Sequence, residues 1–156
     1  MERVYIGVGS NLGDRSSFLK KAQLRVAQIP GVRFLRSSTL YETDPVGGPP
    51  QGKYLNGVWE IETSLTPREL KDRLREIESG LGRKPAQPNS SREIDLDILF
   101  YGERVIDDFD LKIPHVRLHE RLFVLEPLAE LAPDKIHPRL NQSIRELLEK
   151  QHENHP

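Results

Sequence analysis

The segment with the clearest chemical potential is the apolar run Ile94–Tyr101, which carries two aspartates separated by one residue. A strand sends alternate side chains to opposite faces, so Asp95 and Asp97 share one face with α-carbons ~6–7 Å apart. Two neighbouring carboxylates repel each other unless a cation lies between them, and hard oxygen ligands of this kind suit Mg²⁺. We therefore expect a magnesium site at Asp95 and Asp97, with Arg92 reaching a phosphate beside it.

The alternative interpretation of this pair is a solvated strand face with two surface acids, because Asp-x-Asp is a short motif. The apolar residues Ile94, Leu96 and Ile98 alternate with the acids and would bury the opposite face. Such strong alternation favours an interior strand of the sheet over an edge strand. The residues alone leave both interpretations of the pair open.

Other residues have chemical potential only in combination. Tyr54 and Asn56 point the same way from one expected strand, which suits a flat heterocycle that one residue stacks on and the other binds at its edge. His115 follows a proline and has donors for a phosphate, although a structural or surface histidine explains it equally well. Phe123 taken alone is more typical of a core residue than of a ligand platform.

The glycine-rich run Gly7–Gly13 follows a strand pattern and precedes a helix pattern, as dinucleotide-binding loops do. Its third glycine falls one residue late for G-x-G-x-x-G, and the chain contains no G-x-x-x-x-G-K-[ST] motif. We therefore favour a tight strand-to-helix turn over a dinucleotide-binding loop.

Composition narrows the class of protein further. The 156 residues suit one domain, and a net charge of -1 argues against a nucleic-acid binder with a broad basic face. The absence of cysteine excludes disulfides, thiolate zinc sites and a cysteine nucleophile. No secretory leader pattern opens the sequence, and no apolar run approaches the ~20 residues of a membrane span. We expect a soluble, cytoplasmic protein.

Hydrophobic periodicity predicts the elements that position these residues. Strands are expected over Val4–Gly9, Val32–Tyr41, Tyr54–Thr63 and Ile94–Tyr101, and an edge hairpin over Arg104–Ile106 and Leu111–Ile113. Helix caps are predicted at Asp14 and, as capping boxes, at Thr66 and Ser143.

The resulting order βαββαβ predicts an α+β fold with a ferredoxin-like core and an antiparallel sheet. Additional helices from the carboxy-terminal third would cover the second sheet face and complete an α/β/α three-layer arrangement. We expect residues 1–156 to form one domain, with a frayed tail over residues 152–156. Thr43–Lys53 and Gly80–Ser91 are long and irregular, which is typical of functional loops.

Seven segments together resemble the 6-hydroxymethyl-7,8-dihydropterin pyrophosphokinase (HPPK) family of folate biosynthesis. They are, in chain order, Gly7–Gly13, Ser37–Gly47, Tyr54–Asn56, Leu81–Arg83, Arg92–Asp97, Pro114–His115 and Arg121–Leu128. The R-x-x-D-[LIV]-D-[IL] core with the later P-H and R-x-F-V-L pieces is highly specific. This resemblance implies a diphosphokinase that transfers pyrophosphate from ATP to the pterin hydroxymethyl group, giving AMP and the pterin diphosphate.

The resemblance also implies a role for each matched residue. Asp95 and Asp97 would hold two Mg²⁺ ions, and Arg83 and Arg92 would join them as catalytic residues that steady the phosphates. The implied nucleotide-binding residues are Glu78, Arg83, Arg92, Ile98, His115 and Arg121. The implied pterin-binding residues are Thr43, Pro45, Val46, Tyr54, Asn56 and Phe123. No strong general base is among them, which fits phosphoryl transfer by positioning and charge stabilisation.

Three departures from the family pattern bear on affinity and loop closure more than on reaction type. Gln87–Ser91 replaces the usual basic or aromatic residue followed by Gly-Pro, so we do not expect a stacking lid over the pterin. Lysine and arginine are also thinner in this loop than is usual, which leaves Arg83, Lys84 and Arg92. Finally, Val116 stands where some relatives have an aromatic residue, and Asp110 where some have arginine. We expect Gly80–Ser91 to become ordered when ATP binds beside Arg83, Lys84 and Arg92.

Two other function classes compete with this interpretation. A different Mg²⁺-dependent phosphotransferase or a nuclease built on Asp95 and Asp97 would not bind pterin. A non-enzymatic ferredoxin-like binding module would need basic and aromatic residues across an exposed sheet face, where this chain has two acids. We expect ATP and the reduced pterin as ligands, and no nucleic acid, membrane or obligate protein partner.

Overall fold

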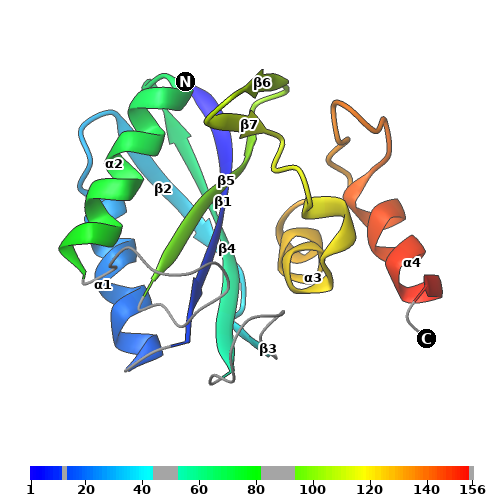
Figure 1. Ribbon diagram of the computed structural model, residues 1–156, viewed down its shortest axis with the longest axis horizontal. Helices are drawn as coiled ribbons and strands as arrows, with labels where there is room; N and C mark the ends of the chain where they lie inside the picture. Colours follow the sequence, from blue (N-terminus) through cyan, green and yellow to red (C-terminus); the bar gives the residue numbers. More distant parts are fainter. Residues whose placement is uncertain (12–13, 44–52, 82–93, 155–156) are drawn as a thin grey trace.

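The computed structural model describes residues 1–11, 14–43, 53–81 and 94–154. Its elements follow one another along the chain as shown in Figure 1. They are β1 (Glu2–Ser10), α1 (Arg15–Ala27), β2 (Val32–Ser37), β3 (Tyr41–Thr43), β4 (Tyr54–Thr63), α2 (Pro67–Gly80), β5 (Asp95–Tyr101), β6 (Ile106–Asp108), β7 (Leu111–Ile113), the 3-10 helix η1 (Leu118–Glu120), α3 (Leu122–Leu131) and α4 (Ile144–Asn154).

The main sheet has the strand order β2-β4-β1-β5, with β3 also paired to β4. All of these pairs are antiparallel. The strands β1 and β2, which are joined by the helix α1, do not pair with each other. The strand β4 therefore lies between β1 and β2, which is the split βαβ arrangement of a ferredoxin-like fold. The predicted fold class is confirmed.

Two predicted strand boundaries are wrong. The expected strand Val32–Tyr41 is divided into β2 and β3, which both pair with β4. At the division the Ser38 hydroxyl accepts a hydrogen bond of 2.9 Å from the Val58 backbone N–H, in place of a strand carbonyl. The first strand of the expected edge hairpin begins at Ile106, where the sequence predicted that it ends.

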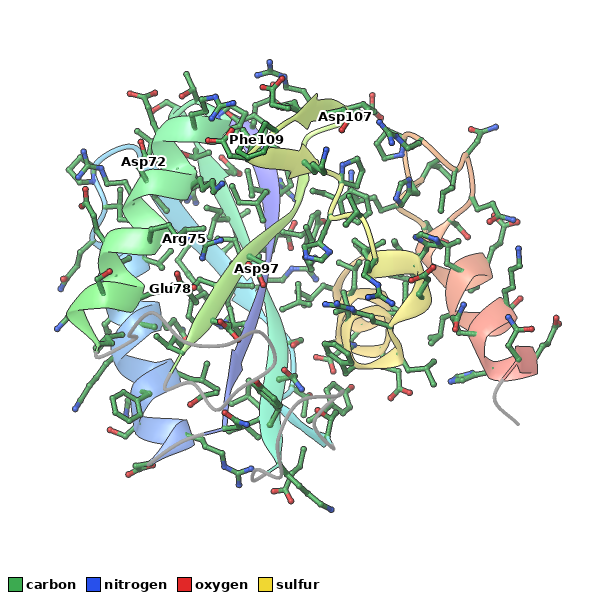
Figure 2. All side chains as sticks on the ribbon, viewed as in Figure 1. Asp72, Arg75, Glu78, Asp97, Asp107 and Phe109 are labelled. Atoms are coloured by element: carbon green, nitrogen blue, oxygen red, sulfur yellow. The ribbon has the colours of Figure 1, made fainter. Side chains whose placement is uncertain are left out.

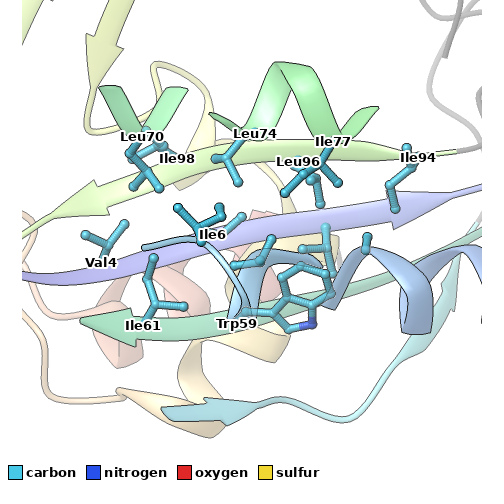
Figure 3. Packing of buried hydrophobic residues seen from close by; sticks show 14 of the residues in the cluster. Val4, Ile6, Trp59, Ile61, Leu70, Leu74, Ile77, Ile94, Leu96 and Ile98 are labelled. Carbon is cyan, nitrogen blue, oxygen red and sulfur yellow. The ribbon is translucent and has the colours of Figure 1, made fainter. Parts of the chain in front are cut away.

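The sheet is the middle of three layers. In Figure 1, α1 and α2 lie on one side of it, and α3 and α4 lie on the other. A core of alternating strand residues, including Ile6, Trp59, Ile61 and Leu96, packs under α1 and α2 (Figure 3). A second cluster around Phe100 and Leu125 joins the other face to α3 and α4. The predicted α/β/α layering is confirmed.

The helix starts follow the predicted caps. The Asp14 side chain accepts from Ser17 N at 3.1 Å before α1. Thr66 and Glu69 form both hydrogen bonds of a capping box before α2. Ser143 and Glu146 make the same reciprocal pair before α4. α4 continues to Asn154, so the helix extends into the segment predicted to fray.

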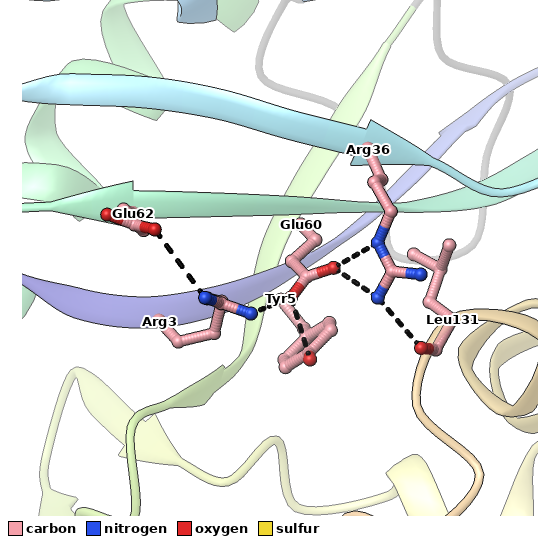
Figure 4. Close-up of polar contacts among 6 residues, drawn as sticks. All are labelled: Arg3, Tyr5, Arg36, Glu60, Glu62 and Leu131. Atoms are coloured by element: carbon pink, nitrogen blue, oxygen red, sulfur yellow. Dashed lines mark hydrogen bonds and ion pairs between the residues drawn. The ribbon is translucent and has the colours of Figure 1, made fainter.

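An ion cluster around the buried Glu60 carboxylate joins the sheet to α3 (Figure 4). The Glu60 carboxylate, 1% exposed, accepts from Arg3 Nη1 at 2.6 Å, Arg36 Nε at 2.7 Å and Tyr5 Oη at 3.1 Å. Arg36 also donates to the carbonyl oxygen of Leu131 at 2.9 Å. Burial raises the pKa of Glu60, but these hydrogen bonds outweigh it and hold the pKa below its ordinary value.

Candidate active site

Asp95 and Asp97 lie on one face of β5, as the sequence predicted. Their cross-strand neighbours on β1 are Gly9 and Gly7. Because glycine has no side chain, no side chain of β1 lies directly beside these two carboxylates. The prediction of an interior strand is wrong for the described part of the chain, since β5 ends the strand order.

The helix α2 compensates for this edge position. Glu78 Oε2 accepts a hydrogen bond from the Leu96 backbone N–H at 2.7 Å. Arg75 Nη1 donates to the Leu96 carbonyl oxygen at 3.0 Å and lies 2.6 Å from Glu78 Oε1. The two side chains thus pair with backbone groups that an inner strand would give to a neighbouring strand. This explains why an edge strand carries the alternation of a buried one.

The acid pair fits a divalent cation. Asp97 keeps 44% of its side chain exposed, and its carboxylate Oδ1 lies 3.3 Å from Arg75 Nη2. In the described residues no group of three or more His, Asp and Glu side chains forms a cage. The two carboxylates of Asp95 and Asp97 suit Mg²⁺, which commonly takes one or two protein carboxylates and completes its shell with phosphate oxygens and water.

Asn56 and Thr43 contact each other on β4 and β3, and β4 lies two strands from the acids on β5. Asn56 on β4 is buried, and its Nδ2 donates a hydrogen bond to the Thr43 hydroxyl on β3. Glycine at position 9 makes room for this amide, because a Cβ there would lie 2.7 Å from Asn56 Oδ1. Tyr54 is half-buried on the same strand, next to this position.

His115, Arg121 and Phe123 flank the site from the segment around η1 and α3. The His115 backbone N–H donates to the Leu99 carbonyl, and its ring Nδ1 accepts from Arg117 N at 3.3 Å. Burial lowers the pKa of His115, against the opposing effect of the Asp97 charge. Burial also lowers the pKa of Arg121, whose guanidinium lies 5.6 Å from the Phe123 ring centroid.

A cavity of about 300 Å³ opens between α2, β5 and the β6–β7 hairpin. It brings together two residues expected at the nucleotide, Ile98 and His115, with the acid Asp97. The lining also includes Arg75 and the fully exposed ring of Phe109, which Figure 2 shows together with Asp97. An apolar floor under a rim of charges suits a flat base that carries phosphates.

Sequence reasoning missed Arg75 and Phe109. Arg75 precedes Glu78 by three residues on α2, and this spacing was the available signal for a side chain on the same helix face. Asp110, predicted as a departure from the family pattern, lies 2.9 Å from Arg68 Nη1 and ties the hairpin to α2.

The expected site residues Pro45, Val46, Arg83 and Arg92 lie outside the described residues, as does Lys84. The same is true of most of the two long loops expected to be functional. Of the remaining expected residues, Glu78 is buried against the backbone of Leu96, between the two acids in sequence, and Ile98 and His115 line the cavity with Asp97.

The family sequence model of 7,8-dihydro-6-hydroxymethylpterin-pyrophosphokinase (HPPK) matches residues 5–133. The chain belongs to this family. Its enzymes transfer pyrophosphate from ATP to hydroxymethyldihydropterin in folate biosynthesis, so the resemblance drawn from the motifs is confirmed.

Relatives of similar length carry the family's enzyme name, and the chain also matches part of a much longer protein. The Bacillus subtilis 2-amino-4-hydroxy-6-hydroxymethyldihydropteridine pyrophosphokinase is 45% identical over 127 residues, covering 81% of this chain and 76% of that protein. The Aquifex aeolicus enzyme is 40% identical over 146 residues, covering 94% and 90%. The Pneumocystis carinii folic acid synthesis protein fol1 is 42% identical over 96% of this chain, which spans only 20% of fol1.

Solved structures of HPPK-DHPS share the fold. One in complex with substrates matches 99% of this chain with a TM-score of 0.74 at 14% identity. The Plasmodium falciparum wild-type protein matches 96% with a TM-score of 0.73. This chain spans 44% of each of those chains, and the likeness at such low identity concerns the fold alone.

Proposed function

We propose that this HPPK-family chain transfers the pyrophosphoryl group of ATP to the hydroxymethyl oxygen of 6-hydroxymethyl-7,8-dihydropterin. In this reaction the bond between the α-phosphate oxygen and the β-phosphorus breaks, and AMP leaves. The pterin oxygen forms the new bond to the β-phosphorus and loses its proton. The observation that carries the proposal is the position of the acid pair, between a cavity with an apolar floor and the hydrogen-bonded amide of Asn56 and hydroxyl of Thr43.

The strand registers support this division into a pterin side and a nucleotide side. Asn56, Gly9 and Asp95 are cross-strand neighbours on β4, β1 and β5. Strands are spaced about 4.8 Å apart, so the α-carbons of Asn56 and Asp95 lie about 10 Å apart. A bicyclic ring bound beside the Asn56 amide, which itself lies over Gly9, would span this distance with its amide edge at Asn56 and its hydroxymethyl group toward the acids.

We propose Asp95 and Asp97 as the ligands of two Mg²⁺ ions. When bound, Mg²⁺ supplies positive charge that neutralises the phosphate oxygens as the pyrophosphoryl group moves. The protein's own part is to hold the two substrates in line, with no general base required.

The remaining roles follow from placement. Asn56 and Thr43 would bind the pterin edge, while Tyr54 and Phe123 would contact its ring faces. His115 and Arg121 would donate to phosphate oxygens, and Ile98 would contact the base. We also keep Pro45 and Val46 in the pterin-binding set, and Arg83 and Arg92 in the phosphate-binding set, on the strength of the family motif.

No described helix combines the length and apolar character needed to cross a membrane. We propose that residues 1–156 act as one pyrophosphokinase domain, and that it works in the cytoplasm, where its substrate ATP is available.

A product assay tests the proposed function. The chain is incubated with ATP, Mg²⁺ and the reduced pterin, and the nucleotide products are separated. We expect AMP and pterin diphosphate in equal amounts, and no ADP. ADP in place of AMP would indicate a different phosphotransferase. A fluorescence titration with a pterin analogue separates the nuclease alternative, because a nuclease site would not bind the analogue.

A further inference from the structure

Arg75 forms an ion pair with Asp97, and it lies outside the seven motif segments although within residues 5–133, which the family model matches. It projects from α2 toward β5, between Glu78 and Asp97 (Figure 2). Its side chain is 40% exposed and also lines the cavity proposed for the nucleotide. Its position therefore allows it to contact both the acids and a bound ligand.

The guanidinium of Arg75 is held firmly on one side and loosely on the other. Nη1 lies 2.6 Å from Glu78 Oε1 and donates to the Leu96 carbonyl at 3.0 Å. Glu78 is itself 1% exposed and is tied to the Leu96 N–H at 2.7 Å. Nη2 lies 3.3 Å from Asp97 Oδ1, and that carboxylate is 44% exposed.

These two contacts differ in strength for a physical reason. The short Glu78 pair is shielded from water and has further backbone partners, so breaking it leaves a buried charge unpaired. The longer Asp97 pair is half in solvent, where ion pairs contribute little and are easily exchanged. Arg75 can therefore release Asp97 without leaving Glu78.

The local charge makes this exchange favourable when a metal arrives. Glu78, Asp95 and Asp97 are acids, and Arg75 is in direct contact with Glu78 and Asp97, while the charge of Arg121 also acts on Asp97. A divalent cation at Asp97 competes with Nη2 for the negative charge of that carboxylate, whichever of its two oxygens the metal takes. The triphosphate that enters with the metal offers Arg75 a replacement, since a planar guanidinium matches phosphate oxygens well.

We propose that Arg75 neutralises Asp97 in the empty site and transfers its Nη2 to a phosphate oxygen when the metal and nucleotide bind. Nη1 stays on Glu78 and Leu96 throughout. Arg75 is thus a positioning residue that competes with free metal and favours the metal–nucleotide pair. This inference rests on the proposed function for the identity of the nucleotide.

The test compares Arg75→Gln with Arg73→Gln. Arg73 is on the same helix, 53% exposed and paired with Glu76 at 2.9 Å, so its loss removes the same charge away from the site. Mn²⁺ binding to the nucleotide-free protein is measured by electron paramagnetic resonance. Binding of a nonhydrolysable ATP analogue in Mg²⁺ is measured by calorimetry.

In Arg75→Gln, we expect Mn²⁺ to bind about two- to fivefold more tightly, because its competitor for Asp97 is gone. The ATP analogue should bind about tenfold or more weakly, because a charge-assisted hydrogen bond to phosphate is lost. Arg73→Gln should change neither affinity by more than about twofold. Opposite shifts for metal and nucleotide are the signature of the exchange.

Two results would overturn the proposal. Unchanged affinities in Arg75→Gln would show that the arginine only covers the strand edge. Weaker binding of both ligands would show that it only builds the site. If Arg75→Gln does not fold, Arg75→Lys answers the same question, because it keeps the charge for Glu78 but has no second planar edge. Both assays work without pterin or turnover, so they decide this point even if AMP is never formed.

Discussion

Glu60 and Glu78 are both 1% exposed, and each is paired with arginine, yet their surroundings differ. Glu60 lies between the sheet and α3 and is bound by two arginines and a tyrosine. Arg36, one of those partners, ends on the backbone of Leu131. Glu78 lies between α2 and the edge of the sheet, and its arginine also reaches the half-exposed Asp97.

The difference separates a cluster that holds the fold from one that serves a site. Around Glu60, Arg36 ends on a backbone carbonyl, and no ligand position adjoins the carboxylate among the residues described. Around Glu78, Arg75 is fixed on one side by Glu78, and on its other side it contacts Asp97, a carboxylate that can bind a metal. Arg3 also reaches a second carboxylate, Glu62, at 3.5 Å, but Asp97 is the more exposed of the two second partners and lines a cavity together with Arg75.

The largest effect should come from the site cluster. Asp97→Asn removes a metal ligand while keeping the shape of the side chain. We expect AMP formation to fall by about a thousandfold or more, because the charge that neutralises the phosphates is lost. The free energy of unfolding should change by less than about 1 kcal/mol, since the Asp97–Arg75 pair is half in solvent.

Steady-state kinetics and urea denaturation measure both quantities on the same preparation. Activity within tenfold of the parent would contradict the metal assignment. A large loss of stability would instead place Asp97 in the same category as Glu60.

The fold cluster should show the reverse pattern. Glu60→Gln leaves the half-exposed Arg3 and Arg36 without the charge of their shared acceptor, and we expect a loss of about 1.5–3 kcal/mol in the free energy of unfolding. Nucleotide and pterin affinities should stay within about twofold. Glu62→Gln is the matched control on the same strand, because Glu62 meets Arg3 only at 3.5 Å and near solvent.

Urea denaturation compares the three proteins. An unchanged unfolding midpoint in Glu60→Gln would mean that the cluster contributes no net stability. A selective loss of nucleotide affinity would show that Glu60 also serves the site.

Local sequence signals predicted the parts of this fold that depend on local physics. Alternation marked the strands, and the residues Thr66 and Ser143 marked two helix starts through capping boxes. The same alternation failed to show that β5 is an edge strand, because Glu78 and Arg75 protect its backbone from another element. Only the packing of α2 against β5 reveals that arrangement.

The candidate site shows the same division. The spacing of Asp95 and Asp97 predicted a shared face, and the strand periodicity placed Tyr54 with Asn56, but the register of β4, β1 and β5 was needed to place Asn56 beside Asp95. Arg75 lacked a motif of its own, because its importance arises where a helix and a strand distant in sequence meet. The family motifs supplied roles for residues such as His115 that spacing alone left open.

A pH titration adds a second measure of fold stability on the Glu60 side of the sheet. His137 is 3% exposed, and its Nδ1 accepts hydrogen bonds of 3.1 Å from the N–H groups of Arg139 and Leu140. Burial lowers its pKa from 6.5 to about 4. The unfolded chain therefore binds a proton more readily, and stability falls as the pH drops from about 6.5 to about 4.

We expect a loss of about 3 kcal/mol across that range, measured by denaturation at successive pH values. His137→Gln should remove most of the slope above about pH 5, while His115 and, at lower pH, carboxyl groups whose pKa the fold lowers, such as Glu60, keep the rest. The exposed His152 provides the control, and His152→Gln should keep the full slope. A slope unchanged in His137→Gln would contradict the assignment.

The smallest effect should appear on the pterin side of the site. Asn56→Ala removes the amide proposed to bind the pterin edge, and the polar edge of the ligand loses its partner. We expect pterin affinity to fall by about 1–3 kcal/mol, with nucleotide affinity nearly unchanged. Fluorescence titration with a pterin analogue and calorimetry with the ATP analogue measure the two affinities.

Two glycine substitutions separate a direct role of this amide from a general disturbance of the sheet. In Gly9→Ala the new methyl group would lie 2.7 Å from Asn56 Oδ1, so the amide must move and pterin affinity should fall as in Asn56→Ala. In Gly7→Ala the methyl group meets the flexible end of Leu99 at 3.1 Å, which can shift by a few tenths of an ångström. Gly7→Ala should therefore bind the pterin analogue nearly normally. If both glycine variants lost equal affinity for pterin and nucleotide, Asn56 would be a structural residue of the sheet, and the pterin site would have to lie elsewhere.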